Sequence, residues 1–170
     1  MAGRLWRPAP PGHQFRLLSD EAKRWARQLP VQYASLSDSS DRMMLSETVE
    51  AIAGLAANQG EQVVLHQDLH GGNILRAERE PWLAIDPKPL VGEREFDPEG
   101  FLCDGPTLLS KPDAGAVVQR RLDVLADELG LDKRRMRLWG LVHTFAWGFS
   151  RARVIESHLQ AARLIWRTRV

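Results

Sequence analysis

Two neighbouring stretches decide the fold: HQDLHGGNIL at residues 66–75 and WLAIDP at residues 82–87. Short runs of apolar and β-branched residues in and beside them predict strands, and the charged residues between the last two runs predict the turn of a hairpin. Because strand ends joined by a hairpin hold polar side chains rigidly in one place, we expect Asp68, Asn73 and Asp86 to lie close together. The predicted strands are 62–66, 73–76 and 82–85.

These three residues have the chemistry that phosphoryl transfer requires. The transition state is loose, so the protein contributes mainly positioning and charge stabilisation. Asp68 is suited to take the proton of an attacking hydroxyl, whereas the oxygens of Asn73 and Asp86 are ligands that Mg²⁺ prefers. Gly71 and Gly72 permit the tight turn that brings the amide to the carboxylates.

A zinc site is the alternative interpretation of the same stretch. His66, Asp68 and His70 occupy alternate positions, and alternate residues of a strand share one face. Histidine and aspartate are both zinc ligands. This hypothesis gives no role to the Gly71-Gly72-Asn73 segment, so the sequence favours the magnesium hypothesis.

The spacing His66-x-Asp68-x-x-x-x-Asn73 resembles the catalytic loop of protein kinase-like folds. The fuller pattern, with a histidine two positions after the aspartate and Ile-Asp-Pro at 85–87, resembles the aminoglycoside phosphotransferases. Its continuation to residue 97 is similar to the streptomycin 6-kinase and hydroxyurea phosphotransferase branch of that family. The resemblance is dense over residues 61–104 and diffuse elsewhere.

The resemblance implies a role for each matching residue. Asp68 would be the catalytic base, and Asn73 and Asp86 would bind Mg²⁺ and, through it, ATP. His66 would brace the metal-binding loop, and Asp97 would hold the catalytic loop by hydrogen bonds. The resemblance also implies a fold: α+β and mostly helical, a kinase-like C-terminal lobe whose small β-hairpin carries the catalytic and metal loops.

An N-terminal β-lobe is not visible in the sequence. Kinase-like enzymes carry a G-x-G-x-x-G loop and an ATP-binding lysine before the catalytic loop. This chain has neither that motif nor a Walker A loop, and Lys23, the only lysine before Asp68, falls in a helical pattern. We therefore expect residues 1–170 to form one helical lobe with its catalytic segment at 61–104. An exposed apolar edge is expected where the other lobe would dock, with self-association through it.

Composition excludes several classes of function. The 170 residues are 44% hydrophobic and 26% charged, which fits one soluble domain. A net charge of +1 gives no reason to expect a nucleic-acid or membrane partner, and no stretch is long and apolar enough to span a bilayer. The single cysteine, Cys103, excludes an intrachain disulfide and fits a cytoplasmic location. Residues 61–104 carry ten acidic and four basic side chains, which favours a cationic small-molecule substrate.

The rest of the chain has helical periodicity. Pro30 is expected to end the first helix, and the proline- and glycine-rich residues 87–100 are expected to form a loop. In and after this loop, we interpret Lys88 as a solvated residue, with a phosphate or substrate contact as the alternative. Glu93, Glu95 and Asp104 are interpreted as surface residues, with recognition of substrate amines as the alternative. The predicted helices are 20–29, 41–58, 113–129, 132–148 and 150–167.

We predict an ATP-dependent phosphotransferase whose acceptor is an alcohol group of a small molecule, with inactivation of an antibiotic of the aminoglycoside or hydroxyurea type as the result. Two other hypotheses stay open. One is a catalytically silent kinase-like lobe that only binds a small molecule or a partner; the other is a Mg²⁺-dependent phosphohydrolase, in which the same ligands activate water. A protein kinase is disfavoured, because no Ala-Pro-Glu motif follows Asp86 and His-Gln-Asp replaces the usual His-Arg-Asp.

Overall fold

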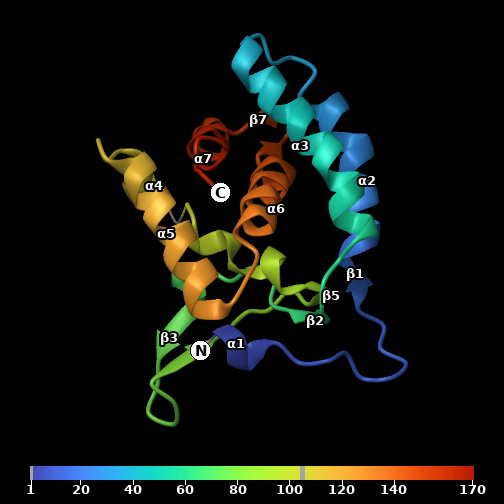
Figure 1. Cartoon of the computed structure of the whole chain (residues 1–170), viewed down its shortest axis with the longest axis vertical. Coiled ribbons are helices and arrows are strands. Elements are labelled where there is room, and N and C mark those ends of the chain that lie inside the picture. Colours follow the sequence, from blue (N-terminus) through green and yellow to red (C-terminus); the bar gives the residue numbers. More distant parts are fainter. Residues whose placement is uncertain (1, 104–105) are drawn as a thin grey trace.

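Helices form most of the molecule, and strands β1 to β5 (residues 16–93) gather at one end of it, away from the β6–β7 hairpin (residues 149–154) (Figure 1). The structure is a computed structural model that describes residues 2–103 and 106–170. Its helices are α1 (Ala2–Leu5), α2 (Leu18–Gln32), α3 (Ser39–Ala57), α4 (Pro106–Leu109), α5 (Ala114–Leu129), α6 (Lys133–Trp147) and α7 (Glu156–Trp166), with the 3₁₀ segments η1 (Gly71–Asn73) and η2 (Arg94–Phe101). Its strands are β1 (Arg16–Leu17), β2 (Gln62–Leu65), β3 (Ile74–Arg76), β4 (Trp82–Ala84), β5 (Leu90–Glu93), β6 (Phe149–Ser150) and β7 (Arg153–Val154). The mostly helical α+β class predicted from the sequence is confirmed.

Helix α6 forms the centre of the hydrophobic core. In Figure 1 it lies between α4 and α5 on one side and α2 and α3 on the other. Its Trp139 is fully buried, and the ring of Phe96 from η2 meets it edge-on with ring centroids 5.4 Å apart. Aromatic side chains of this kind bury roughly 150–250 Å² each, so this pair ties η2 firmly to α6. No helix in the described part of the chain is both long and apolar enough to cross a membrane.

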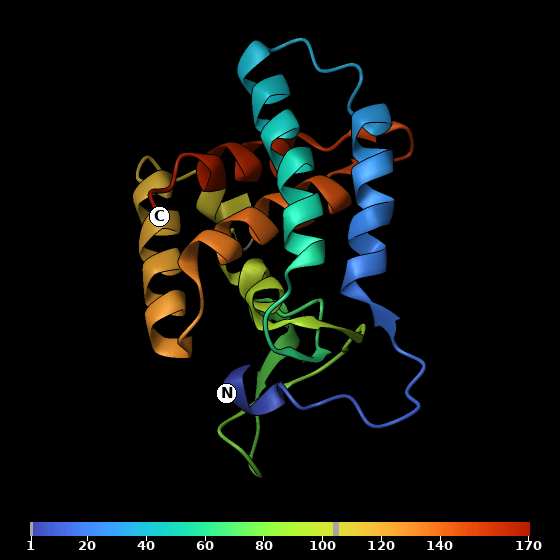
Figure 2. The ribbon, with the colours of Figure 1, turned by 45° about the vertical axis from the view of Figure 1, so that its right-hand side comes forward.

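The strands place two loops beside each other. Strand β5 pairs antiparallel with β2 on one side and parallel with β1 on the other, with Val64 opposite Val91. Strands β3 and β4 form a separate antiparallel hairpin, which projects beside α1 in Figure 2. The loop that leaves β2 and the loop that enters β5 therefore lie at the same edge of the sheet.

Strand β5 corrects the expectation of a loop over residues 87–100. All four residues of β5 are buried, and the pairing extends through Lys88, whose backbone N–H donates to the carbonyl of His66 at 2.9 Å. Gly92 is required here, because a Cβ at this position would lie 2.4 Å from the Cβ of Leu18. The start of α2 can therefore pack directly on the strand.

Two predicted helix boundaries are also wrong. Pro30 lies inside α2, which continues to Gln32 because the buried Leu29 and Tyr33 hold its last turn in place and the N–H of Tyr33 donates to the Leu29 carbonyl at 3.0 Å. The last helix begins at Glu156 rather than near residue 150. The intervening residues form the β6–β7 hairpin, in which Arg151 and Ala152 both have the positive φ of a type I′ turn.

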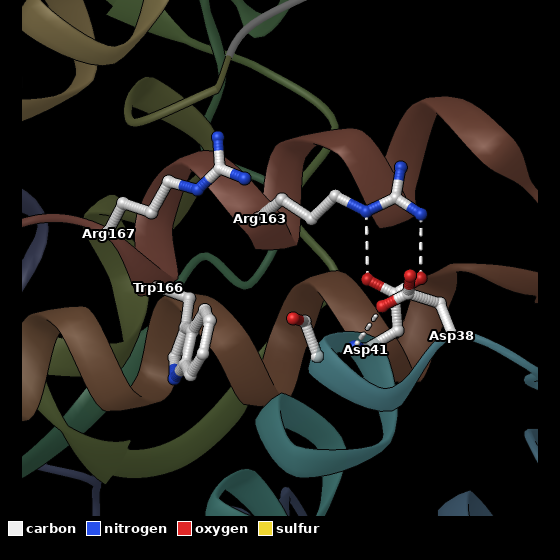
Figure 3. Close-up of a pocket in the computed structure, with 6 residues that line it drawn as sticks. Asp38, Asp41, Arg163, Trp166 and Arg167 are labelled. Atoms are coloured by element: carbon white, nitrogen blue, oxygen red, sulfur yellow. Dashed lines mark hydrogen bonds and ion pairs between the residues drawn. The ribbon is translucent and has the colours of Figure 1, made fainter.

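Helix α7 is fastened to the start of α3 by a paired ion bridge (Figure 3). Asp41, only 3% exposed, accepts hydrogen bonds from Nε and Nη2 of Arg163 at 2.8 and 2.6 Å. Asp38 caps α3 by accepting from the N–H of Asp41 at 3.0 Å. A hollow of about 190 Å³ lies beside this bridge, and three of the charged groups that line it, Asp38, Asp41 and Arg163, already have partners.

Candidate active site

The loop between β2 and η1 is held in place by hydrogen bonds to the carboxylate of Asp97. This carboxylate is 1% exposed and accepts hydrogen bonds from the backbone N–H groups of His66 at 3.1 Å and Gln67 at 2.7 Å. A third bond comes from Nε1 of Trp6 at 2.9 Å. Burial raises the pKa of Asp97, and the three N–H donors oppose that effect. The hydrogen bonds that the resemblance implies for Asp97 are therefore present, and Trp6 joins them.

His66 links this loop to the loop before β5. Its Nε2 lies 2.9 Å from the carbonyl oxygen of Ile85, and since a carbonyl only accepts, Nε2 carries the proton. The carbonyl of His66 accepts from the N–H of Lys88. His66 therefore contacts the residues on both sides of Asp86. Within the part of the chain that the structure describes, no group of three or more His, Cys, Asp or Glu side chains could hold a metal ion, so His66, Asp68 and His70 do not form the alternative zinc site.

Asp68 and Asn73 are fixed relative to each other by the tight turn between them. Asn73 Nδ2 donates to the carbonyl of Asp68 at 2.8 Å, and the backbone N–H of Asn73 donates to the carbonyl of His70 at 2.9 Å. The N–H of Ile85 in turn donates to the carbonyl of Asn73 at 2.9 Å. Because its amide nitrogen is engaged, Oδ1 is the atom of Asn73 that could bind a cation.

Lys88 joins Asp68 to Asp86. Its ammonium is hydrogen-bonded to Oδ2 of Asp68 and lies 3.3 Å from Oδ2 of Asp86. Partial burial would raise the pKa of Asp68, but the Lys88 ammonium, with His70 and Asn73, lowers it below its ordinary value. Asp68 is therefore a carboxylate at neutral pH. The Lys88 side chain is 53% exposed, as expected for a solvated residue, and it also contacts both carboxylates, which sequence reasoning did not predict.

Asp86 itself stands at a strained point of the chain. Its φ is 54°, in the region that disfavours non-glycine residues, and its side chain is 69% exposed. Residues held in this conformation cluster at functional sites. Asp86 lies two residues after the end of β4, and Lys88 contacts both its carboxylate and that of Asp68.

The described residues of the site offer too few ligands for a metal held by protein side chains alone, but their oxygens suit Mg²⁺. No group of three or more His, Cys, Asp or Glu side chains in residues 2–103 and 106–170 could hold a metal ion. Asn73 Oδ1 and the Asp86 carboxylate offer oxygen ligands, and Mg²⁺ commonly takes one or two protein ligands together with phosphate oxygens and water. Lys88 shows that a positive charge fits between the two carboxylates.

A cavity of about 430 Å³ opens beside Asp68. Its walls come from the loop between β2 and η1, from η2 and from helices α4, α6 and α7. Burial raises the pKa of the Cys103 thiol in its wall to about 12, so this cysteine is not a nucleophile at neutral pH. Sequence reasoning missed the polar residues of the far wall, because no motif links them to the catalytic loop. They are Glu99, His143, Trp147 and His158.

The acidic residues interpreted as surface groups have different positions. Glu93 is fully buried and receives hydrogen bonds from Arg135, Trp139 and Gly60, so it is a structural residue and faces no substrate. Glu95 accepts from the N–H of Asp132 at 3.4 Å. Asp104 lies outside the described residues. On the β3–β4 side, Leu75, Trp82 and Ile85 are exposed by 48%, 54% and 39%. That another lobe or a second copy docks on this side stays a prediction.

This mostly helical α+β fold and its loop arrangement fit a kinase-like protein, and comparison with known proteins identifies the family. Residues 1–156 match the family model described as aminoglycoside/hydroxyurea antibiotic resistance kinase. The chain belongs to this family. The branch suggested by the motif at 61–104 is therefore confirmed.

Three curated relatives show the similarity. The chain is 43% identical to a streptomycin 6-kinase of Streptomyces glaucescens over 133 residues, which cover 78% of this chain and 42% of that protein. It is 44% identical to a streptomycin 6-kinase of Streptomyces griseus over 135 residues, with 79% and 43% covered. A hydroxyurea phosphotransferase of Kitasatospora aureofaciens is 41% identical over 133 residues, with 78% and 36% covered. The chain spans less than half the length of these relatives.

Proposed function

We propose that the chain is the kinase-like C-terminal lobe of an ATP-dependent phosphotransferase that acts on an alcohol group of a small molecule. The observation that carries this proposal is the meeting of Asp68, Asn73 and Asp86 at one sheet edge, with a cavity open beside Asp68. Family membership supports it. The acceptors named for the relatives, streptomycin and hydroxyurea, are the first candidates.

In the proposed reaction, the acceptor hydroxyl lies in the cavity with its proton directed at Asp68. The hydroxyl oxygen attacks the γ-phosphorus of ATP, a new O–P bond forms, the bond to the ADP oxygen breaks, and Asp68 takes the proton. The lowered pKa of Asp68 keeps it ionised and able to orient the hydroxyl. Asn73 and Asp86 would hold Mg²⁺. When bound, this ion neutralises part of the negative charge of the phosphates. Lys88 supplies a further positive charge at the same place.

The substrate is further proposed to be cationic. The cavity is bordered by the carboxylates of Asp68 and Glu99, and the segment 61–104 carries an excess of acidic side chains. Such a site attracts positive charge and raises the local concentration of a basic acceptor. Streptomycin is a base of this kind, whereas hydroxyurea is uncharged at neutral pH.

Replacing Asp86 by alanine tests the cation site. We expect Mg²⁺-dependent ATP binding to weaken about tenfold or more, because one of the two protein oxygens that would hold the ion is removed. Calorimetric titration of ATP into the chain, with and without Mg²⁺, measures the effect. Glu78→Ala is the matched control: it removes one carboxylate from the exposed hairpin turn and should bind as the unmodified chain does. Equal affinities for all three chains would remove Asp86 from the cation site.

The same preparation separates the proposed function from its alternatives. Transfer of radiolabelled γ-phosphate to streptomycin or hydroxyurea supports the phosphotransferase. Release of free phosphate from ATP at the same rate with and without acceptor would point instead to a phosphohydrolase. Saturable binding of an acceptor with no nucleotide binding would point to a silent binding lobe.

A further inference from the structure

Two histidines of the cavity wall have buried ring nitrogens without a partner. His143 comes from α6 and His158 from α7, and both line the cavity that contains Asp68. Among the described residues, neither Nε2 of His143 nor Nδ1 of His158 has a hydrogen-bond partner, although both atoms are shielded from solvent. A buried polar atom left unpaired costs free energy, and nearly all such atoms in native proteins have a partner. Both rings line the cavity, so a group bound there can pair with these atoms once the side chains that shield them move aside.

Glu99 determines which hydrogen bond His143 can make. Oε2 of Glu99 lies 2.8 Å from Nδ1 of His143, and since a carboxylate only accepts, the proton of the ring is on Nδ1. In the neutral ring, Nε2 is then a bare acceptor. Trp147 stacks on the ring with centroids 3.8 Å apart, and Phe96 meets it at 5.7 Å. The ring is therefore held in one plane, with Nδ1 fixed at Glu99.

His158 belongs to the same electrostatic cluster. Burial lowers its pKa, the neighbouring His143 lowers it further, and Glu99 partly opposes both effects. His158 is therefore neutral at neutral pH. Together with His143, it gives the wall opposite the catalytic loop two unsatisfied nitrogens on adjacent helices.

We propose that His143 and His158 are specificity-determining residues of the acceptor site, and that their unpaired nitrogens bind hydrogen-bonding groups of the acceptor while another of its hydroxyls lies at Asp68. This inference rests on the proposed phosphotransferase function. It favours an acceptor with several O–H and N–H groups, because a cavity of about 430 Å³ is of the size that encloses a ring system. An aminoglycoside such as streptomycin meets this condition, and a molecule as small as hydroxyurea fills only a minor part of the space.

The test uses asparagine and glutamine in a crossed design. The amide of asparagine reaches about as far as Nδ1 of histidine, and that of glutamine about as far as Nε2. His143→Asn therefore keeps a donor for Glu99 but loses the Nε2 acceptor, whereas His143→Gln retains an acceptor there. At the other position the unpaired atom is Nδ1, so His158→Gln loses it and His158→Asn retains it.

We expect the streptomycin dissociation constant to rise about tenfold in His143→Asn and His158→Gln, and to change about threefold or less in His143→Gln and His158→Asn. Calorimetric titration of streptomycin into each chain measures this, and circular dichroism melting confirms folding. If the residues only filled space, affinity would follow side-chain size, and both glutamine variants would bind better than both asparagine variants. That order, or equal affinity in all variants, would overturn the proposal. If one pair does not fold, the other pair decides.

Failure of this inference can be distinguished from failure of the proposed function. If the unmodified chain binds no streptomycin but transfers phosphate to hydroxyurea, the inference is wrong and the phosphotransferase function stands. If the unmodified chain transfers phosphate to neither and binds neither, both are wrong. If streptomycin binds with the crossed pattern and no phosphate is transferred, the acceptor site is supported and the proposed reaction is not.

Discussion

Replacing Asp68 by asparagine is expected to lower the rate of phosphoryl transfer about a thousandfold while Mg·ATP affinity stays within about threefold. The amide cannot take the proton of the acceptor hydroxyl, so the step that needs a base is lost. Nucleotide binding should persist, because Asn73 and Asp86 would hold the cation and Asp68 need not. Transfer of labelled phosphate and calorimetric titration of ATP measure the two quantities on one preparation.

The control for this variant is Asp127→Asn on α5, an exposed carboxylate whose conversion changes the net charge identically. It should retain full activity and affinity. If Asp68→Asn lost transfer and nucleotide affinity to the same extent, Asp68 would be a binding residue and its assignment as the base would be wrong.

Glu93→Ala is expected to destabilise the fold by about 3–5 kcal/mol, which for a chain of this length lowers the melting temperature by roughly 10 °C. The fully buried carboxylate receives bonds from Nε and Nη2 of Arg135 at 2.9 and 2.7 Å, from Nε1 of Trp139 and from the N–H of Gly60. Its removal leaves a guanidinium and two N–H groups without their acceptor. Thermal unfolding followed by circular dichroism gives the change in stability.

Two further variants define the cause of this effect. Glu93→Gln preserves size and some hydrogen bonding, so it should lie between Glu93→Ala and the unmodified chain. Glu61→Ala, a largely exposed glutamate whose ion pair with Arg94 is 3.5 Å long, should melt within about 2 °C of the unmodified chain. If the Glu93→Ala chain also melted within about 2 °C of the unmodified chain, the buried network would contribute little to stability.

The closeness of Asp68, Asn73 and Asp86 could be predicted because these residues are near one another in the sequence. Asp68, Asn73 and Asp86 belong to one loop–hairpin unit, so their spacing alone brings them together. The helices with a clear apolar stripe and a cap were predicted for the same reason: Asp132 accepts from the N–H of Arg135 at 2.9 Å, and Gly130 ends α5 with a φ of 62°.

The parts that were missed depend on contacts between distant segments. Strand β5 is short and surrounded by prolines and glycines, and it becomes a strand because β2 and the start of α2 pack against it. The sequence indicates ordinary charged loop residues at Lys88 and Glu93. In the structure, Lys88 contacts two carboxylates and Glu93 is buried against α6. His143 and His158 meet only because α6 and α7 pack together. No periodicity of a single segment contains that information.

The cavity has a consequence for how the protein can change over generations. Of the residues that we place in the transfer chemistry, only Asp68 borders the cavity, whereas Leu109, Ser157 and Ala161 of its wall belong to helices or turns elsewhere in the chain. Substitutions at these wall positions can alter the shape offered to an acceptor without moving the loop that carries the reaction. Under the proposed function, such substitutions would change the range of acceptors by small steps while the residues of the transfer reaction stay in place.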